Sequence, residues 1–140
     1  MPFVRIDLYD STPRAERRAI ADAVYEAMRE TISIPEGDRF IVVTAHGEDE
    51  IFIDPHFQGM NRSERYVAIE IRLNQGRTTE LKQALYKRVA ERVQEATGIS
   101  TDDVMILLTE CTAVDWSFGK GEAQFVLHPP AWVKQSGEGK

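Results

Sequence analysis

The sequence predicts an α+β fold of the α/β type, in which two pseudo-symmetric β-α-β units form a four-stranded mixed sheet with two helices on one face. The main observation is an internal repeat. The apolar residues at positions 4, 6, 20, 24, 28, 34, 40 and 42 recur in kind 65 residues later (69 − 4 = 65). Such a repeat indicates two similar halves, about 2–46 and 66–110. Right-handed crossovers put both helices on one face, and the other face would be apolar and uncovered in a monomer, so we expect an oligomer.

The first half shows the signals of strand, helix and strand in order. Residues 3–9 alternate between apolar and polar, which is typical of a half-buried strand. Ser11-Thr12-Pro13 predicts a helix start, with a hydroxyl at the N-cap and proline at the first helical position, and Pro35 stops the helix. The continuous apolar run 40–44 predicts a strand buried on both faces. In the polar segment that follows, residues 51–53 are expected to form a short strand of a hairpin.

The second half repeats this plan. Residues 66–73 alternate like a strand, and Thr78 or Thr79 is expected to cap the next helix. Gly98 closes that helix as a left-handed cap, and the apolar run 104–108 predicts the last strand of the repeat.

The C-terminal part has no counterpart in the first half. It contains an aromatic loop and strand, residues 115–127, with the strand expected at 123–127. We expect one domain over residues 1–128 and a tail over 129–140, mobile at its end.

Composition excludes several classes of protein. A net charge of −6 without a basic stripe argues against a nucleic-acid partner. The apolar runs are too short to span a membrane. The single Cys111 rules out an internal disulfide and favours a reducing, cytoplasmic location. His46, His56 and His128 have no metal-ligand spacing, so we expect no metal site.

The amino terminus is the first candidate for chemistry. Pro2 follows the initiator Met1 and leads into a strand. Removal of Met1 would leave a secondary amine at a fixed position, able to act as a base, an acid or a nucleophile toward a carbonyl. The alternative is that Pro2 is simply tolerated where a strand begins.

Two further candidates can be compared with their repeat counterparts. Arg77 corresponds to Thr12, so the turn does not require arginine. A guanidinium beside a helix N-terminus opposes the helix dipole, which indicates an anionic partner such as a substrate carboxylate. Asp38 corresponds to Asp103, and both precede a strand, so the sequence leaves open whether Asp38 is catalytic or a turn residue.

The chain resembles the tautomerase superfamily, and within it the malonate semialdehyde decarboxylase subgroup. The resemblance covers residues 2 to about 127 and is carried by the amino-terminal proline, the two β-α-β halves and three motifs: Pro35-Glu36-Gly37-Asp38-Arg39-Phe40, Gly76-Arg77-Thr78 and Asp115-Trp116-Ser117-Phe118-Gly119. It implies a homotrimer without a cofactor, with a pocket for small oxo acids or unsaturated acids.

The resemblance also implies roles for individual residues. Pro2 matches the catalytic proline, Asp38 the aspartate that positions water or assists proton transfer, and Arg77 the carboxylate-binding arginine. Trp116, Phe118 and Phe125 match the apolar wall of the pocket. One departure is that Gln75 stands where some members carry a second arginine. Gln75 could hydrogen-bond the same carboxylate or face solvent, and the change weakens the substrate assignment more than the enzyme class.

These residues support a cofactor-independent enzyme acting on a small oxo acid, with decarboxylation favoured by the tail motif. A neutral Pro2 could shuttle protons as in a keto–enol tautomerase or form an iminium ion that releases carbon dioxide. A cationic Pro2 could polarise a carbonyl while Asp38 orients water, as in a hydratase. A non-catalytic trimeric binding protein is the alternative if Met1 is retained, because an acylated proline nitrogen has no usable lone pair. A dimeric ferredoxin-like sensor would also have two such halves but gives no reason for Pro2 or Arg77.

Overall fold

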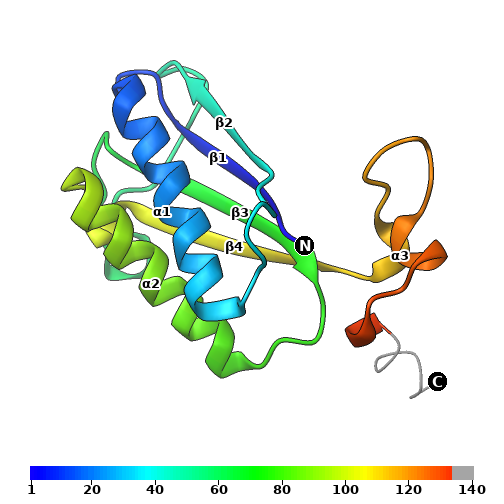
Figure 1. Cartoon of the computed structure of the whole chain (residues 1–140). Coiled ribbons are helices and arrows are strands. Elements are labelled where there is room, and N and C mark those ends of the chain that lie inside the picture. The colour runs from blue at the N-terminus through cyan, green and yellow to red at the C-terminus, as the bar shows by residue number, and fades with distance from the viewer. Residues whose placement is uncertain (134–140) are drawn as a thin grey trace.

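The computed structural model describes residues 1–133. Its sheet has four strands in the order β2-β1-β3-β4, and two long helices cover one face (Figure 1). β1 pairs with β2 and β3 with β4 in parallel, whereas the central strands β1 and β3 are antiparallel. The predicted mixed sheet of two β-α-β units is confirmed. Leaving aside single 3-10 turns, the elements are β1 Phe3–Tyr9, α1 Arg14–Ile32, β2 Ile41–His46, β3 Val67–Asn74, α2 Thr79–Thr97, β4 Val104–Cys111 and α3 Gln124–Leu127.

The two units match at the offset found in the sequence. α1 and α2 both have 19 residues, and their first residues are 65 apart (79 − 14 = 65). The turns before β2 and β4 match as well. Asp38 N donates to Pro35 O at 3.2 Å, and Asp103 N donates to Ser100 O at 2.9 Å. The pseudo-two-fold relation therefore extends to single residues, and each site residue can be compared with its counterpart.

The core lies between the sheet and the two helices. The inward side chains of β1 and β3 are at most 1% exposed: Val4, Ile6, Leu8, Val67, Ile69, Ile71 and Leu73. Their burial fixes the register of the two strands, because a slip by one residue would turn them to the open face. Since β1 and β3 are antiparallel, the beginning of β1 and the end of β3 are held at the same end of the sheet.

The helix ends agree with the predictions for α2 and differ for α1. Thr78 Oγ1 accepts a hydrogen bond from Leu81 N at 3.2 Å, and Gly98 ends the helix with a left-handed φ of 75°. At α1, however, Pro13 holds the N-cap position without a side-chain bond, and the predicted hydroxyl cap is absent. Thr12 is instead buried, with its carbonyl oxygen accepting a hydrogen bond from the Arg17 side chain.

The expectation that β2 and β4 are buried on both faces is wrong for the chain alone. Both are edge strands, and their apolar side chains alternate between the core and the face without helices. On that open face Val42 is 41% exposed, Met105 47% and Leu107 55%. No other layer of residues 1–133 covers them, so the predicted uncovered face exists in this part of the chain, and its apolar part lies on the edge strands.

Two predicted strands are not formed. Residues 51–53 belong to an irregular segment with no sheet partner. Residues 124–127, expected in a strand, form the short helix α3. The physical reason is local: the Gln124 side chain accepts from Phe118 N and donates to Gly119 O, both at 2.8 Å. These bonds fold the segment back on its own loop, away from any strand edge.

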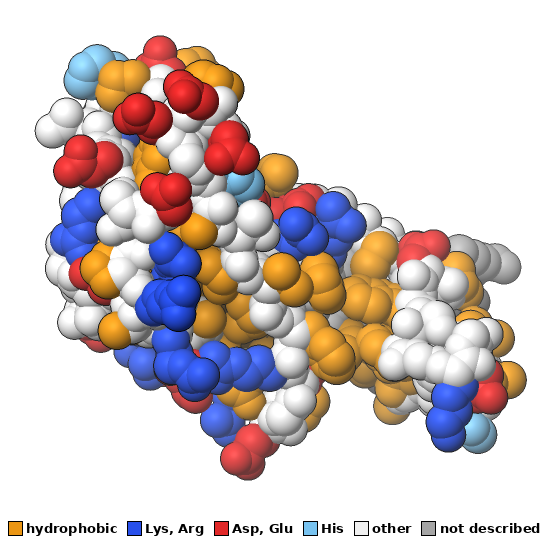
Figure 2. Space-filling model, turned by 90° about the horizontal axis from the view of Figure 1, so that it is seen from above, with side chains coloured by type: hydrophobic (Ala, Val, Ile, Leu, Met, Phe, Trp, Pro, Cys, Tyr) orange, Lys and Arg blue, Asp and Glu red, His pale blue; other side chains and the backbone are white. Residues whose placement is uncertain are grey.

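The residues after β4 form an extension, here called the C-terminal arm (residues 112–133), which stands off from the sheet beyond the amino terminus (Figure 1). Hydrophobic side chains gather where this arm meets the rest of the molecule, whereas acidic side chains cluster at the opposite end (Figure 2). Four aromatic rings run through the arm in sequence, Trp116–Phe118–Phe125–Trp132, with centroids 5.6, 4.9 and 5.3 Å apart. The part of the predicted mobile tail after residue 133 lies outside the described residues.

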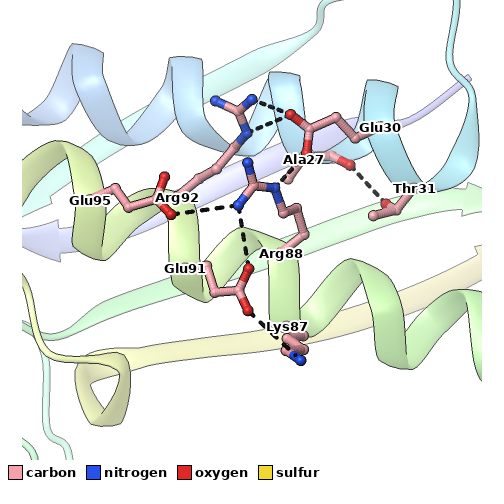
Figure 3. A network of polar contacts seen from close by, with 8 residues as sticks. All are labelled: Ala27, Glu30, Thr31, Lys87, Arg88, Glu91, Arg92 and Glu95. Atoms are coloured by element: carbon pink, nitrogen blue, oxygen red, sulfur yellow. Dashed lines mark hydrogen bonds and ion pairs between the residues drawn. The ribbon is translucent and has the colours of Figure 1, made fainter.

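A network of charges joins the two helices on the outer surface (Figure 3). Glu30 of α1 pairs with both Arg88 and Arg92 of α2, and Arg88 also reaches Glu91 and Glu95. The hydrogen bonds from Arg92 and Arg88 lower the pKa of Glu30 to about 2. The network therefore ties the helices of the two pseudo-symmetric units to each other.

Candidate active site

A cavity of about 640 Å³ opens at the end of the sheet where β1 begins and β3 ends. Side chains and backbone from both units meet there. The lining residues are Met1, Thr31, Ile32, Ser33, Ile34, Pro35, Asn74, Gln75, Gly76, Arg77, Leu81 and Trp132. The cavity thus contains the amino terminus, the turn after β3 and one ring of the C-terminal arm.

Pro2 is buried immediately before β1, and the chain that follows it is held by two neighbouring segments. The next inward residue, Val4, donates its backbone N–H to Phe40 O at 2.9 Å, and Phe3 pairs with Arg72 of β3. The amino group of Met1 shows which effects act on the pKa of an amine at this end of the chain. Burial lowers its pKa, Asp38 opposes this effect and Arg77 adds to it. An amine held here is therefore biased toward its neutral, nucleophilic form.

Asp38 differs from its pseudo-symmetric counterpart in its side-chain partners. The Asp103 carboxylate accepts bonds from Ser63 N and Ser63 Oγ, each at 2.6 Å. Asp38 is also buried, at 8% exposure against 3% for Asp103, but its Oδ1 has no hydrogen-bond partner and its Oδ2 lies 3.7 Å from the Met1 amino group. Burial raises the pKa of Asp38, opposed by the amino terminus and Arg77. The Asp103 carboxylate therefore holds its turn to Ser63, whereas the Asp38 carboxylate makes no corresponding hydrogen bonds.

Arg77 is half-buried and largely unpaired. Its Nη1 donates to Asn74 O at 3.1 Å, and within residues 1–133 it forms no ion pair with a carboxylate. Burial lowers the pKa of its guanidinium, while Glu110 and Asp38 act in the opposite direction. The remaining donors of the guanidinium are thus available to a carboxylate in the cavity.

The other expected site residues do not all line the same cavity. Gln75 lines the cavity, but it is exposed, and only its backbone N–H is bonded, to Cys111 O at 2.9 Å. Trp116 lines an adjacent cavity of about 370 Å³ with Phe3 and Cys111. Phe118 and Phe125 line neither cavity and connect Trp116 to Trp132 through ring contacts.

Two cavity residues were missed from the sequence. Trp132 follows Pro129-Pro130 and lies in the segment expected to be the tail, 129–140, and an aromatic residue there was the available signal. Asn74 is followed by Gln75 and Gly76, a run typical of a turn, where asparagine is common. In the structure it is the last residue of β3, only 4% exposed, with its Oδ1 accepting from Trp116 Nε1 at 2.9 Å.

The histidines do not form a metal site. His46 Nε2 lies 2.6 Å from Asp7 Oδ1, at the opposite end of β1 from Pro2. Over residues 1–133, no group of three His, Cys, Asp or Glu side chains could hold a metal ion. Nor does this part of the chain contain a helix long and apolar enough to cross a membrane.

Comparison with known proteins places this geometry in a family. Two profiles described as tautomerase enzyme match residues 38–119 and 2–61. Probable tautomerases YusQ and YrdN of Bacillus subtilis (strain 168) are 36% and 32% identical over 126 residues, covering 90% of this chain and 99% and 97% of those proteins.

Solved structures of tautomerase-family proteins are also similar to this chain. A crystal structure of FG41 malonate semialdehyde decarboxylase inhibited by 3-bromopropiolate is 40% identical, with a TM-score of 0.85 over 92% of this chain and 98% of that one. A second malonate semialdehyde decarboxylase is 29% identical with the same TM-score, over 92% of this chain and 99% of that one. Native fused 4-OT, 16% identical with a TM-score of 0.73 over 90% and 99%, shares the fold. The chain belongs to the tautomerase superfamily, in the subgroup that resembles malonate semialdehyde decarboxylase.

Proposed function

We propose that this chain is a cofactor-independent decarboxylase of a small 3-oxo acid, with malonate semialdehyde as the first candidate and Pro2 as the reacting amine. The observation that carries the proposal is a half-buried amino terminus, beside a carboxylate with an unpartnered oxygen, Asp38, and near a guanidinium that pairs with no carboxylate of residues 1–133, Arg77. The 40% identity to a malonate semialdehyde decarboxylase supports this choice of substrate class.

The proposed chemistry starts from the neutral secondary amine that removal of Met1 would leave. Its nitrogen attacks the C3 carbonyl carbon, and the carbonyl oxygen leaves as water, which gives an iminium ion. The C1–C2 bond then breaks, carbon dioxide leaves, and the bonding pair moves through C2 to the positively charged nitrogen as an enamine. Protonation at C2 and hydrolysis release acetaldehyde and restore the amine. Burial lowers the pKa of the Met1 amine in this structure, and a Pro2 amine in the same surroundings is expected to be biased toward the neutral form that this reaction requires.

The other residues of the site bind the substrate or move protons during these reaction steps. Arg77 binds the substrate carboxylate and thereby fixes the C3 carbonyl near Pro2. Asp38 takes and returns the protons that move as water leaves and re-enters, because its Oδ1 is an unused acceptor. Gln75 can add one hydrogen bond at the mouth of the cavity, where a second arginine would add charge. The ring of Trp132, which lines the cavity, and that of Trp116, which lines the adjacent one, limit access of water from the arm side.

A second candidate is a tautomerase or hydratase of another small oxo or unsaturated acid. It is favoured by the same free Asp38 Oδ1, which could hold a water molecule, and by the names of the curated relatives, both probable tautomerases. A non-catalytic binding protein becomes the better assignment if Met1 is retained, since Met1 itself occupies the cavity.

We further propose a cytoplasmic homotrimer. The open sheet face carries exposed Met105 and Leu107, and the C-terminal arm exposes Val126, Leu127 and Trp132. A protein surface of this kind is normally covered by another subunit. Fused 4-OT, which has the same fold, has been described as a symmetric trimer. Light scattering at micromolar concentration tests this, and a monomeric mass would contradict it.

Proton NMR of the protein incubated with malonate semialdehyde tests the proposed activity, with Pro2→Ala as the matched control. Alanine also permits removal of Met1, so the control keeps a free but primary amine. We expect acetaldehyde with the wild type and a loss of most turnover in Pro2→Ala. Wild-type turnover in the variant would refute the role of Pro2. No product with wild type would transfer the assignment to the second candidate.

A further inference from the structure

We propose that Asn74 is a substrate-binding residue whose side-chain nitrogen donates a hydrogen bond to the C3 oxygen of an acid held by Arg77. The inference deepens the proposed function and rests on it only for the class of ligand. Asn74 is the last residue of β3 and lines the same cavity as Met1 and Arg77. The backbone carbonyl oxygen of Asn74 accepts a hydrogen bond from Arg77 Nη1 at 3.1 Å, so the two residues are in direct contact.

The orientation of the Asn74 amide follows from its neighbours. Trp116 Nε1 can only donate, and it lies 2.9 Å from Oδ1 of Asn74. The thiol of Cys111 also faces Oδ1, at 3.8 Å. A flipped amide would set its own N–H groups against these donors, so the oxygen is fixed toward Trp116. The nitrogen is the end that remains for a ligand.

That nitrogen is buried and has no hydrogen-bond partner. Leaving a buried amide donor unpaired is costly, and native proteins contain few such groups. Within the part of the chain that the structure describes, only one other buried side-chain atom lacks a partner, Oδ1 of Asp38. One unpaired donor and one unpaired acceptor therefore belong to the same candidate site. An oxo acid accepts from Asn74 at its carbonyl oxygen, and its hydrated form can also donate to Asp38.

The same contacts give Trp116 a more specific function than an apolar wall. Its indole N–H holds the oxygen of Asn74, and its ring stacks on Phe118 at 5.6 Å. Trp116 is thus a positioning residue that acts through Asn74. Phenylalanine at this position would keep the ring contact and lose the hydrogen bond.

Selective labelling provides a direct test, because the chain has two asparagines, Asn61 and Asn74. Protein labelled with ¹⁵N-asparagine gives two side-chain amide signals, and exposed Asn61 serves as the internal control. The probes are 3-hydroxypropionate and propionate, which have the same charge and differ by the oxygen at C3. We expect 3-hydroxypropionate to move the Asn74 signal downfield, propionate to have a smaller effect, and the Asn61 signal to stay in place. An Asn74 signal that does not move at any concentration of either acid overturns the inference.

Affinities of the variants complete the test. We expect Asn74→Leu to weaken binding of 3-hydroxypropionate about 3- to 10-fold and to leave propionate nearly unchanged. Trp116→Phe should reduce the same preference, and Asn61→Leu should retain it. Equal losses for both acids would assign Asn74 a structural role and overturn the inference. Failure of the wild type to decarboxylate malonate semialdehyde would refute the proposed activity alone, because the binding preference is measured without turnover.

Discussion

The two equivalent aspartates should differ in how much stability the same substitution to asparagine costs. The Asp103 carboxylate accepts two hydrogen bonds of 2.6 Å from Ser63, and Asp103→Asn removes the charge and one of the two acceptor oxygens. Hydrogen bonds to a charged group contribute about 1.5–3 kcal/mol each, and an amide offers one acceptor where two are needed. We expect the free energy of unfolding to fall by about 2–4 kcal/mol.

Asp38→Asn should cost little stability. Its Oδ1 has no hydrogen bond to lose, and its Oδ2 faces the amino group of Met1 at 3.7 Å. The pKa of Asp38 is raised by burial, so at neutral pH its ionised form opposes folding, and neutralising the side chain relieves that cost. We expect a change within about 1 kcal/mol, in either direction, together with a large loss of turnover.

Urea unfolding followed by far-UV circular dichroism measures both effects. Fluorescence would be less suitable, because both tryptophans lie in the C-terminal arm and not in the core. The variants are compared at one protein concentration, since the stability of an oligomer depends on it. An Asp38→Asn variant as unstable as Asp103→Asn, with normal turnover, would refute the reasoning and make Asp38 a turn residue.

Two further predictions concern the charges around the amine. Arg77→Lys keeps the charge but loses the planar fork, so KM for malonate semialdehyde should rise roughly 10-fold, whereas Arg18→Lys on the exposed side of α1 should have no effect. If the neutral amine reacts, kcat/KM falls as pH drops through the lowered pKa of the terminus. Because Asp38 raises that pKa and Arg77 lowers it, Asp38→Asn should move this acid limb to lower pH and Arg77→Gln to higher pH. Limbs that move in the opposite directions would contradict the electrostatic account.

The sequence was most informative where the same pattern occurs twice. Equal spacing in the two halves correctly predicted both helices, the four paired strands and the face left uncovered. Repetition alone could not separate Asp38 from Asp103, because both precede a strand in the same kind of turn. Only the partner of each carboxylate distinguishes them, and that partner comes from a distant part of the chain.

The unrepeated segments were predicted less well. Apolar residues at 123–127 suit a strand, but residues 124–127 form a helix and the Gln124 side chain bonds to its own loop. Asn74 looks like a turn residue because its significance depends on Trp116, 42 residues away in the sequence. Such contacts arise from the position of the arm, which no local pattern encodes.

The intact mass of a preparation that turns over substrate shows whether Pro2 carries the reacting amine. A reacting Pro2 must have a free amine, so the active protein should have a mass lower than that of the full chain by one methionine residue. An active preparation that retains Met1 on every molecule would contradict it, because the nitrogen of Pro2 would then be an amide without a usable lone pair.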